Sequence, residues 1–120
     1  MNRKAMRSLV EKILQNEGVT SPMVVSLFVV GDRKMRQLNR DFHDIDATTD
    51  VLSFPYLDPA SRVDERAFRQ FEEEGIVLGD LVISYPEVVR EASKKGILVD
   101  EEVELLVEHG MNHLLGKHHD

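Results

Sequence analysis

The chain has 120 residues, 42% of them hydrophobic and 31% charged, so it can form one globular domain with a buried core but not two. It contains no cysteine, which excludes disulfides and thiolate metal sites, and no apolar run approaches the roughly 18 residues of a membrane-spanning helix. The net charge of -7 disfavours a general nucleic-acid coat, because phosphate binding needs clustered basic side chains.

The first third of the chain predicts a helix, a strand and a second helix. Residues 3–16 carry apolar side chains at helical spacing, and Gly18 marks the expected end of that helix. Val24 to Val30 is a continuous, β-branched apolar run, which predicts a strand buried on both faces. Asp32 is expected to cap the next helix. The apolar positions of that helix are Met35, Leu38 and Phe42.

Two further strands are expected in the middle of the chain. Residues 50–56 predict a strand, and Pro55 indicates that it lies at an edge of the sheet. Residues 57–75 are acidic and polar, as is typical of a solvated insertion. Residues 76–84 predict a third strand, in which Gly79 indicates a bulge or a close approach of another backbone.

The C-terminal third predicts two helices. Ser84 and Glu87 have the spacing of a capping box, and the helix that they begin is expected to end at Gly96. Asp100 is expected to cap the last helix, which Gly116 ends. The resulting order α-β-α-β-β-α-α predicts a single domain of mixed α+β architecture.

Histidines gather at the end of the last helix. His109 and His113 are four residues apart, so their side chains lie one above the other and can share a zinc ion at Zn–N distances of about 2.0–2.1 Å. Gly116 allows the chain to turn back and bring His119 to the same ion, for which the adjacent His118 is a competing ligand. Three protein ligands leave a fourth position open, which indicates a catalytic site.

The spacing H-x-x-x-H-x-x-G-x-x-H is that of the metzincin zinc proteases. Those proteases carry a glutamate general base directly after the first histidine, where this chain has Gly110. Peptide hydrolysis is therefore disfavoured. Chance scatter of histidines or a tag remnant at 118–119 explains the pattern less well, because neither accounts for the helical spacing of His109 and His113.

Three ordered blocks resemble one known family. Residues 109–119 (HGMNHLLGKHH) are similar to the HGxLHLxGYDH signature of the YbeY endoribonucleases, also called rRNA maturation factors. Upstream, Leu38-Asn39 and residues 49–55 (TDVLSFP) match the LN...TDVLSFP block of that family, and residues 78–84 (LGDLVIS) match its LGDIVIS strand. The blocks cover most of the chain at spacings similar to those of the family.

The resemblance implies a metal-dependent endoribonuclease that is specific for single strands and acts in rRNA maturation, at the 3′ end of the small-subunit rRNA, and in ribosome quality control. It implies an α+β fold over residues 1–120, with a mixed sheet of three to four strands, about four to five helices, and the metal site on the last helix and the following turn. One zinc ion per chain would be bound by His109, His113 and His119. The implied partners are rRNA and the ribosome, together with ribosomal or GTPase proteins, and neither membrane nor DNA.

The sequence also differs from the family pattern. His43 occupies the position of an arginine that follows Leu-Asn in the family and is thought to face the metal pocket. Asn112, Lys117 and His118 replace leucine, tyrosine and aspartate of the signature, and the sequence ends at Asp120, where family members usually continue into a further helix. These differences concern catalytic rate and substrate contact more than metal binding.

Two residues are candidates for the catalytic pocket by analogy with the family, His43 and Asp50, although Asp50 can equally brace the loop before its strand. The chemistry stays open between water delivered to phosphorus and attack by the RNA 2′-hydroxyl, and no residue is clearly the general base. The alternatives are a ribosome-associated module with structural zinc and, less favoured, a zinc peptidase.

Charge is unevenly distributed along the chain. Residues 1–40 contain eight basic and three acidic side chains, whereas the rest contains seven basic and nineteen acidic ones. This asymmetry is a mild indication of a basic surface that meets a polyanion, although solvated basic helices would give the same counts. The expected RNA contacts are Arg33, Lys34, Arg36 and Arg40. No apolar segment follows the basic N-terminus, so we expect no secretory signal and a cytoplasmic location.

Overall fold

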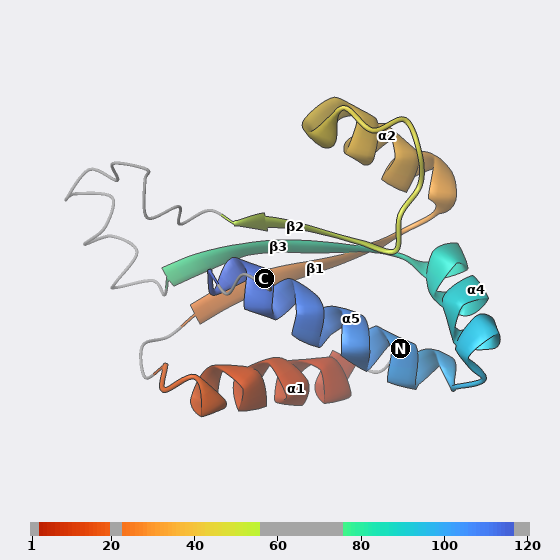
Figure 1. Cartoon of the computed structure of the whole chain (residues 1–120). Coiled ribbons are helices and arrows are strands. Elements are labelled where there is room, and N and C mark those ends of the chain that lie inside the picture. Colours follow the sequence, from red (N-terminus) through yellow and green to blue (C-terminus); the bar gives the residue numbers. More distant parts are fainter. Residues whose placement is uncertain (1–2, 20–22, 56–75, 117–120) are drawn as a thin grey trace.

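The computed structural model describes residues 3–19, 23–55 and 76–116, which form an α+β fold as predicted (Figure 1). The elements in these ranges are α1 (Arg3–Asn16), β1 (Met23–Val30), α2 (Asp32–His43), β2 (Val51–Pro55), β3 (Ile76–Ser84), α4 (Tyr85–Lys95) and α5 (Val99–Leu114). The insertion predicted at 57–75 lies outside the described residues. No helix in the described ranges is long and apolar enough to cross a membrane.

The three described strands form one mixed sheet in the order β1-β3-β2. β3 is central and pairs parallel with β1 and antiparallel with β2, which confirms that β2 lies at an edge. The prediction that β1 is buried on both faces is wrong, because β1 lies at the other edge of the described sheet. Val24, Phe28 and Val29 are each more than 40% exposed. An apolar run has the same sequence pattern at an edge as at the centre, and the neighbouring elements decide its burial.

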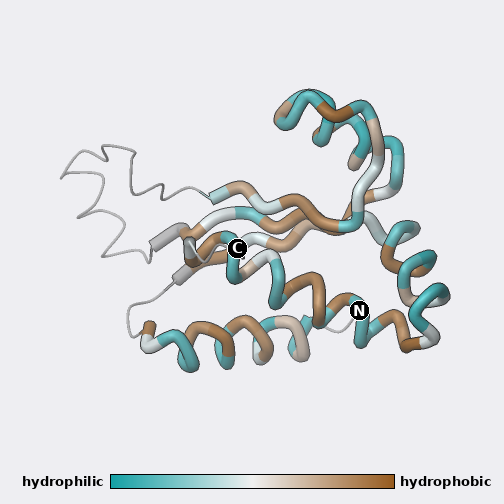
Figure 2. The backbone as a smooth tube through the Cα atoms, in the orientation of Figure 1, coloured by the Kyte–Doolittle hydropathy of each residue, from teal (hydrophilic) through white to brown (hydrophobic). Residues whose placement is uncertain are grey.

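The main core lies between the sheet and α5, with α1 packed against the same helix. Figure 1 shows α1 and α5 on one side of the sheet and α2 on the other, and Figure 2 shows hydrophobic residues along the strands and along α1 and α5. Alternate residues of β3 face the two sides, so Leu81 and Ile83 join the α5 core, whereas Val82 packs with Met35 of α2 and Leu52 of β2.

Gly79 forms the close approach that its position in β3 predicts. The register between β1 and β3 shifts at Val24/Val25, directly opposite Gly79, as in a β-bulge. A Cβ atom at Gly79 would overlap the carbonyl oxygen of Phe54 and lie 2.7 Å from Leu114 Cδ2. The missing side chain therefore allows β2 and the C-terminal end of α5 to approach β3 together.

Asp32 joins three elements and is not the helix cap predicted from the sequence. α2 begins at Asp32 with Gly31 as its N-cap. The Asp32 carboxylate instead accepts hydrogen bonds from Ser84 Oγ at 3.1 Å, from Thr48 Oγ1 at 3.2 Å and from the Arg90 guanidinium at 2.8 and 2.9 Å. These bonds hold the N-terminus of α2, the loop before β2 and the start of α4 at one junction.

Ser84 caps α4 as predicted, but the second half of the predicted capping box does not form, because Ser84 N donates to Asp50 O and the Glu87 carboxylate binds Arg90. Ser84 Oγ accepts a hydrogen bond from Glu87 N, and Gly96 ends α4 in the left-handed conformation.

α5 begins differently from the prediction. The N-cap of α5 is Leu98, so the prediction that Asp100 caps this helix is wrong. The first turn of α5 contains three consecutive acidic residues, and negative charge is favourable at a helix N-terminus. This pattern predicts where the first turn lies, but it does not predict which residue caps it.

An ion pair between an exposed lysine and a buried glutamate connects α4 and α5. The side chain of Glu102 is 1% exposed, and Lys95 Nζ donates to its two oxygens at 2.9 and 3.0 Å. These hydrogen bonds raise the pKa of Lys95. Burial of the carboxylate is therefore matched by a cation from the last turn of the preceding helix.

Replacing Gly79 with alanine is expected to destabilise the fold by about 1–3 kcal/mol, because the new methyl group overlaps backbone that cannot rotate away. Urea unfolding would measure the loss. The control is Gly31→Ala, whose Cβ would meet nothing within 4 Å among the described residues, so that it should lose only the small preference of an N-cap for glycine over alanine. Equal stability of the two variants would contradict the proposed role of Gly79.

Stability is expected to depend on the ionisation of Asp32. Its hydrogen bond to Arg90 holds the pKa of Asp32 below the ordinary value of 3.8, so the unfolded chain takes up the proton first as the pH falls. The contribution of Asp32 is therefore complete above pH 3.8 and disappears as the pH falls toward the lowered pKa. The difference in urea midpoint between the wild type and Asp32→Asn should shrink over that range. A constant difference down to the lowest pH at which the protein folds would refute this linkage.

Candidate metal centre

Two histidines converge on the surface of α5. His109 and His113 are exposed and one helical turn apart, with ring centroids separated by 4.6 Å and Nε2 atoms by 3.2 Å. The opposite face of the same turn is anchored in the core by Gly110, Met111 and Leu114, which are all buried. Packing of the apolar face thus directs both imidazoles outward.

The nitrogen separation fits a shared metal ion. Two nitrogens at about 2.0–2.1 Å from one tetrahedral zinc ion lie about 3.3 Å from each other, and His109 Nε2 and His113 Nε2 are 3.2 Å apart. His119 and its competitor His118 lie outside the described residues. Within residues 3–19, 23–55 and 76–116 no group of three histidine or acidic side chains could hold a metal. A complete three-ligand site therefore stays a prediction.

Gly110, the residue in place of a protease glutamate, faces the core. It is buried, and an added Cβ would lie 2.6 Å from Leu81 Cδ2. A side chain at this position would enter the space between α5 and β3 and would not reach the surface that carries His109 and His113. The structure adds a steric reason to the chemical one, since a side chain at this position would have to displace Leu81 from the core.

His43 lies at the C-terminal end of α2 and stacks on Phe54 of β2. The two ring centroids are 5.9 Å apart with an interplanar angle of 25°. Phe54 packs with the small core under α2, and its ring centroid lies 5.2 Å from that of Phe42 at an interplanar angle of 67°. His43 is thus on the α2 face of β2, whereas α5 packs against the opposite face. The structure does not group His43 with His109 and His113, and its catalytic role stays a prediction.

Asp50 lies in the loop immediately before β2. Its Oδ1 accepts hydrogen bonds from Val51 N at 2.8 Å and from Thr49 Oγ1 at 3.4 Å, and its main-chain oxygen accepts one from Ser84 N at 2.9 Å. These bonds are those of a residue that braces the start of a strand. A direct role of Asp50 in catalysis stays a prediction.

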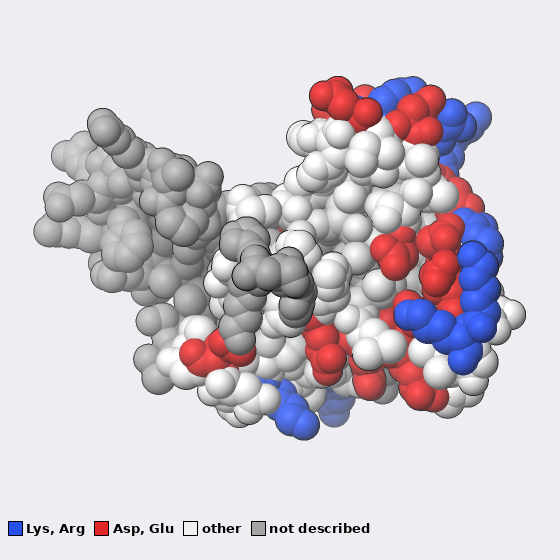
Figure 3. Space-filling model, in the orientation of Figure 1, with Lys and Arg blue, Asp and Glu red and all other residues white. Residues whose placement is uncertain are grey.

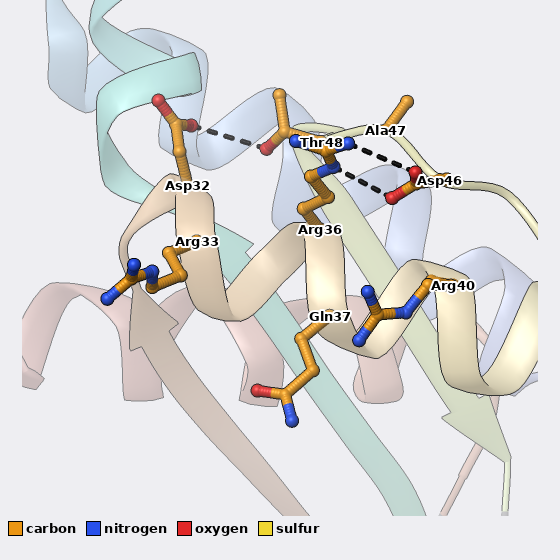
Figure 4. A pocket seen from close by; sticks show the side chains of 8 residues that line it. All are labelled: Asp32, Arg33, Arg36, Gln37, Arg40, Asp46, Ala47 and Thr48. Carbon is orange, nitrogen blue, oxygen red and sulfur yellow. Dashed lines mark hydrogen bonds and ion pairs between the residues drawn. The ribbon is translucent and has the colours of Figure 1, made fainter.

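The basic residues of α2 do not all lie together. Arg33, Arg36 and Arg40 share one helical face and line a depression of about 880 Å³ against the loop that follows α2 (Figure 4). Lys34 is exposed but does not line it. Figure 3 shows basic side chains over α2 and α4, interleaved with acidic ones. The predicted RNA contacts thus divide into three arginines in one depression and a lysine outside it.

Arg36 is already paired with a carboxylate. Its Nε and one terminal nitrogen donate to the two oxygens of Asp46 at 2.8 and 3.0 Å. The hydrogen bonds raise the pKa of Arg36 and lower that of Asp46, so both groups stay charged. Arg36 thereby holds the loop beside α2, and its own charge is largely neutralised.

Sequence reasoning did not single out four of the residues that line this depression, which are Gln37, Asp46, Ala47 and Thr48. Gln37 lies one helical turn after Arg33, so helical spacing would have placed it on the same face. Asp46 has no such signal, because its position depends on how the loop folds back along α2. That path is stabilised by the hydrogen bond from Asn39 Nδ2 to Ala47 O at 2.9 Å.

The chain is similar to proteins of one family. A family model described as Endoribonuclease YbeY matches residues 1–120. The endoribonuclease YbeY of Roseiflexus sp. (strain RS-1) is 39% identical over 111 residues, which are 92% of this chain and 66% of the relative. That of Desulforamulus reducens is 38% identical over 116 residues, 97% of this chain and 72% of the relative. That of Moorella thermoacetica is 40% identical over 104 residues, 87% of this chain and 65% of the relative. The chain thus spans about two thirds of the length of these relatives.

Introducing the protease glutamate is expected to destabilise the protein and to confer no peptidase activity. Gly110→Glu would bury a carboxylate against Leu81, which should cost more than about 3 kcal/mol. Thermal unfolding and a generic casein assay would measure the two effects. Asn112→Glu, two residues along α5 at a half-buried position, is the control and should lose far less. A stable Gly110→Glu variant that cleaves casein would overturn this assignment of the helix face.

Proposed function

Because this chain belongs to the endoribonuclease YbeY family, we propose that it cleaves single-stranded RNA in a reaction that depends on a metal ion. The observation that carries the proposal is the convergent pair His109 and His113 on the exposed face of α5. Relatives with the same family name supply the reaction class, and the donor chemistry of the imidazole pair supplies the metal dependence.

We propose zinc as the metal, with one ion per chain. His109 and His113 would hold it together with His119, and imidazole nitrogen is a ligand that zinc prefers. When bound, zinc supplies a Lewis acid for a phosphoryl oxygen and lowers the pKa of water to about 7. The chain itself fixes the two imidazoles four residues apart on a helix whose opposite face is buried, which limits how far they can separate.

The proposal leaves the general base unassigned. Gly110 occupies the position that supplies the general base in the metzincin zinc proteases, and this disfavours a zinc peptidase. Attack by the RNA 2′-hydroxyl and attack by water both remain compatible with the donor set. His43 and Asp50 are the two candidates proposed from the sequence.

We further propose that the substrate is rRNA within the ribosome, in maturation of the small-subunit 3′ end and in ribosome quality control. The net charge of -7 weakens attraction to free RNA, so a ribosomal or GTPase protein partner would help to hold the substrate. The same proposal places the protein in the cytoplasm, with no role for membrane or DNA.

A second candidate is a ribosome-associated module whose zinc is structural. His43, which replaces the family's arginine, is packed on Phe54 across β2 from α5, and this observation favours weak catalysis. Ribosome association that survives chelation, without nuclease activity above that of a histidine variant, would support this alternative.

Loss of one histidine is expected to remove both metal and activity. In His113→Ala the zinc content, measured by mass spectrometry, should fall from one ion per chain to near zero, because one imidazole of the pair is gone. Cleavage of a single-stranded oligoribonucleotide and of rRNA in ribosomes should fall roughly 100-fold or more.

The matched control is Glu104→Gln, an exposed change on the same helix that should retain both zinc and cleavage. Chelation of the wild type should reproduce the His113→Ala result, and added zinc should restore activity. Equal cleavage by the wild type and His113→Ala would remove the metal-centred proposal.

A further inference from the structure

The outward face of α2 carries a row of polar side chains that are all exposed. Arg33, Arg36 and Arg40 follow each other at three and four residues, and Gln37 lies between the last two. Asp46 and the loop residues Ala47 and Thr48 form the other wall of the depression. Figure 4 shows Arg33 and Arg40 at the two ends of the row, with Arg36 turned toward Asp46.

The two end arginines have charges that are not neutralised in the way that Arg36 is. Within the described part of the chain Arg33 forms no ion pair. Arg40 has one 3.5 Å contact between its Nε and the neighbouring Asp41, and both side chains are more than half exposed. An ion pair of this length and exposure contributes little, so Arg40 can exchange it for another anion. Asp32, at the edge of the depression, is bound to Arg90.

The spacing of the row selects a polyanion. Arg33 and Arg40 are seven residues apart, which is about 10 Å along a helix axis. Neighbouring phosphates of one strand can contact both guanidinium groups at once, whereas an isolated phosphate reaches both only if the two side chains bend toward each other. Guanidinium groups bind phosphate oxygens through paired hydrogen bonds, and Gln37 between them can donate to a phosphate or a sugar hydroxyl.

We propose that this depression is a backbone-binding groove for single-stranded RNA, with Arg33 and Arg40 on successive phosphates and Gln37 between them. Arg36 stays with Asp46 and keeps the loop wall in place, and Lys34 takes no part. The groove acts at a distance from the histidine pair, so it retains the strand and does not cleave it. This inference rests on the proposed function for the identity of the strand as RNA.

The test measures binding of a fluorescein-labelled single-stranded oligoribonucleotide by anisotropy between about 50 and 200 mM KCl. For single strands the plot of log K against log salt has a slope of about -0.7 per phosphate contact. Arg33→Gln and Arg40→Gln should each make the slope about 0.7 less steep. Between the lowest and the highest salt concentration, each variant should therefore lose about 2.5-fold less affinity than the wild type loses. Lys34→Gln removes the same charge from the same helix outside the groove. It should change the slope by less than half as much as either arginine variant does.

An equal reduction in all three variants would show general electrostatic attraction and overturn the groove, as would a wild type whose binding does not depend on salt. Binding is measured in the His113→Ala background so that the strand stays intact, and cleavage is measured separately with His113 present. Slopes that depend on Arg33 and Arg40 without any cleavage would retain the groove and refute the nuclease. Cleavage that requires His113, with slopes that do not change in the two arginine variants, would support the nuclease and refute the groove.

Discussion

The close packing of α5 on β3 is the constraint on which the rest of the molecule depends. Two glycines make it possible, because Gly110 leaves room for Leu81, and Gly79 leaves room for Leu114 and for the backbone of Phe54. A buried helix face fixes the rotation of the helix about its own axis. His109 and His113 are therefore directed outward by residues that take no part in their chemistry, and the same rotation turns position 110 away from any role as a general base.

Polar contacts hold the α2 side of the sheet to a greater extent than they hold the α5 side. The small apolar core on the α2 side is supplemented by the junction at Asp32, where carboxylate, hydroxyl and guanidinium groups from α2, the loop before β2 and α4 with its cap meet. Charge-assisted hydrogen bonds of this kind are directional, and they fix the loop before β2 as well as the helix. The same loop then supplies Asp46 to Arg36, so that one wall of the basic depression depends on contacts made at the other end of α2.

The chain is acidic overall, and the proposed nuclease function requires a local exception. Like charges repel a polyanion over about a Debye length, roughly 8 Å at physiological salt, so a basic row on one helix acts only at short range. An arrangement in which Arg33 and Arg40 contact the strand, while Arg36 is neutralised by Asp46, gives weak and salt-sensitive binding. Such binding suits the proposed rRNA substrate, which other parts of a ribosome would also hold in place.

The fold class, most helix and strand boundaries, the bulge at Gly79 and the pairing of His109 with His113 could be predicted from the sequence, because each depends on local periodicity or on a residue with restricted backbone chemistry. Tertiary structure alone decided that β1 is an edge strand and that Asp32 binds Arg90 instead of capping α2. It alone also placed His43 across β2 from α5, and Asp46 against Arg36. These features join residues 10 to 58 positions apart or depend on which face of the sheet a helix covers. The spacing of residues along the sequence does not predict such long-range contacts, since they form only when the whole chain has packed.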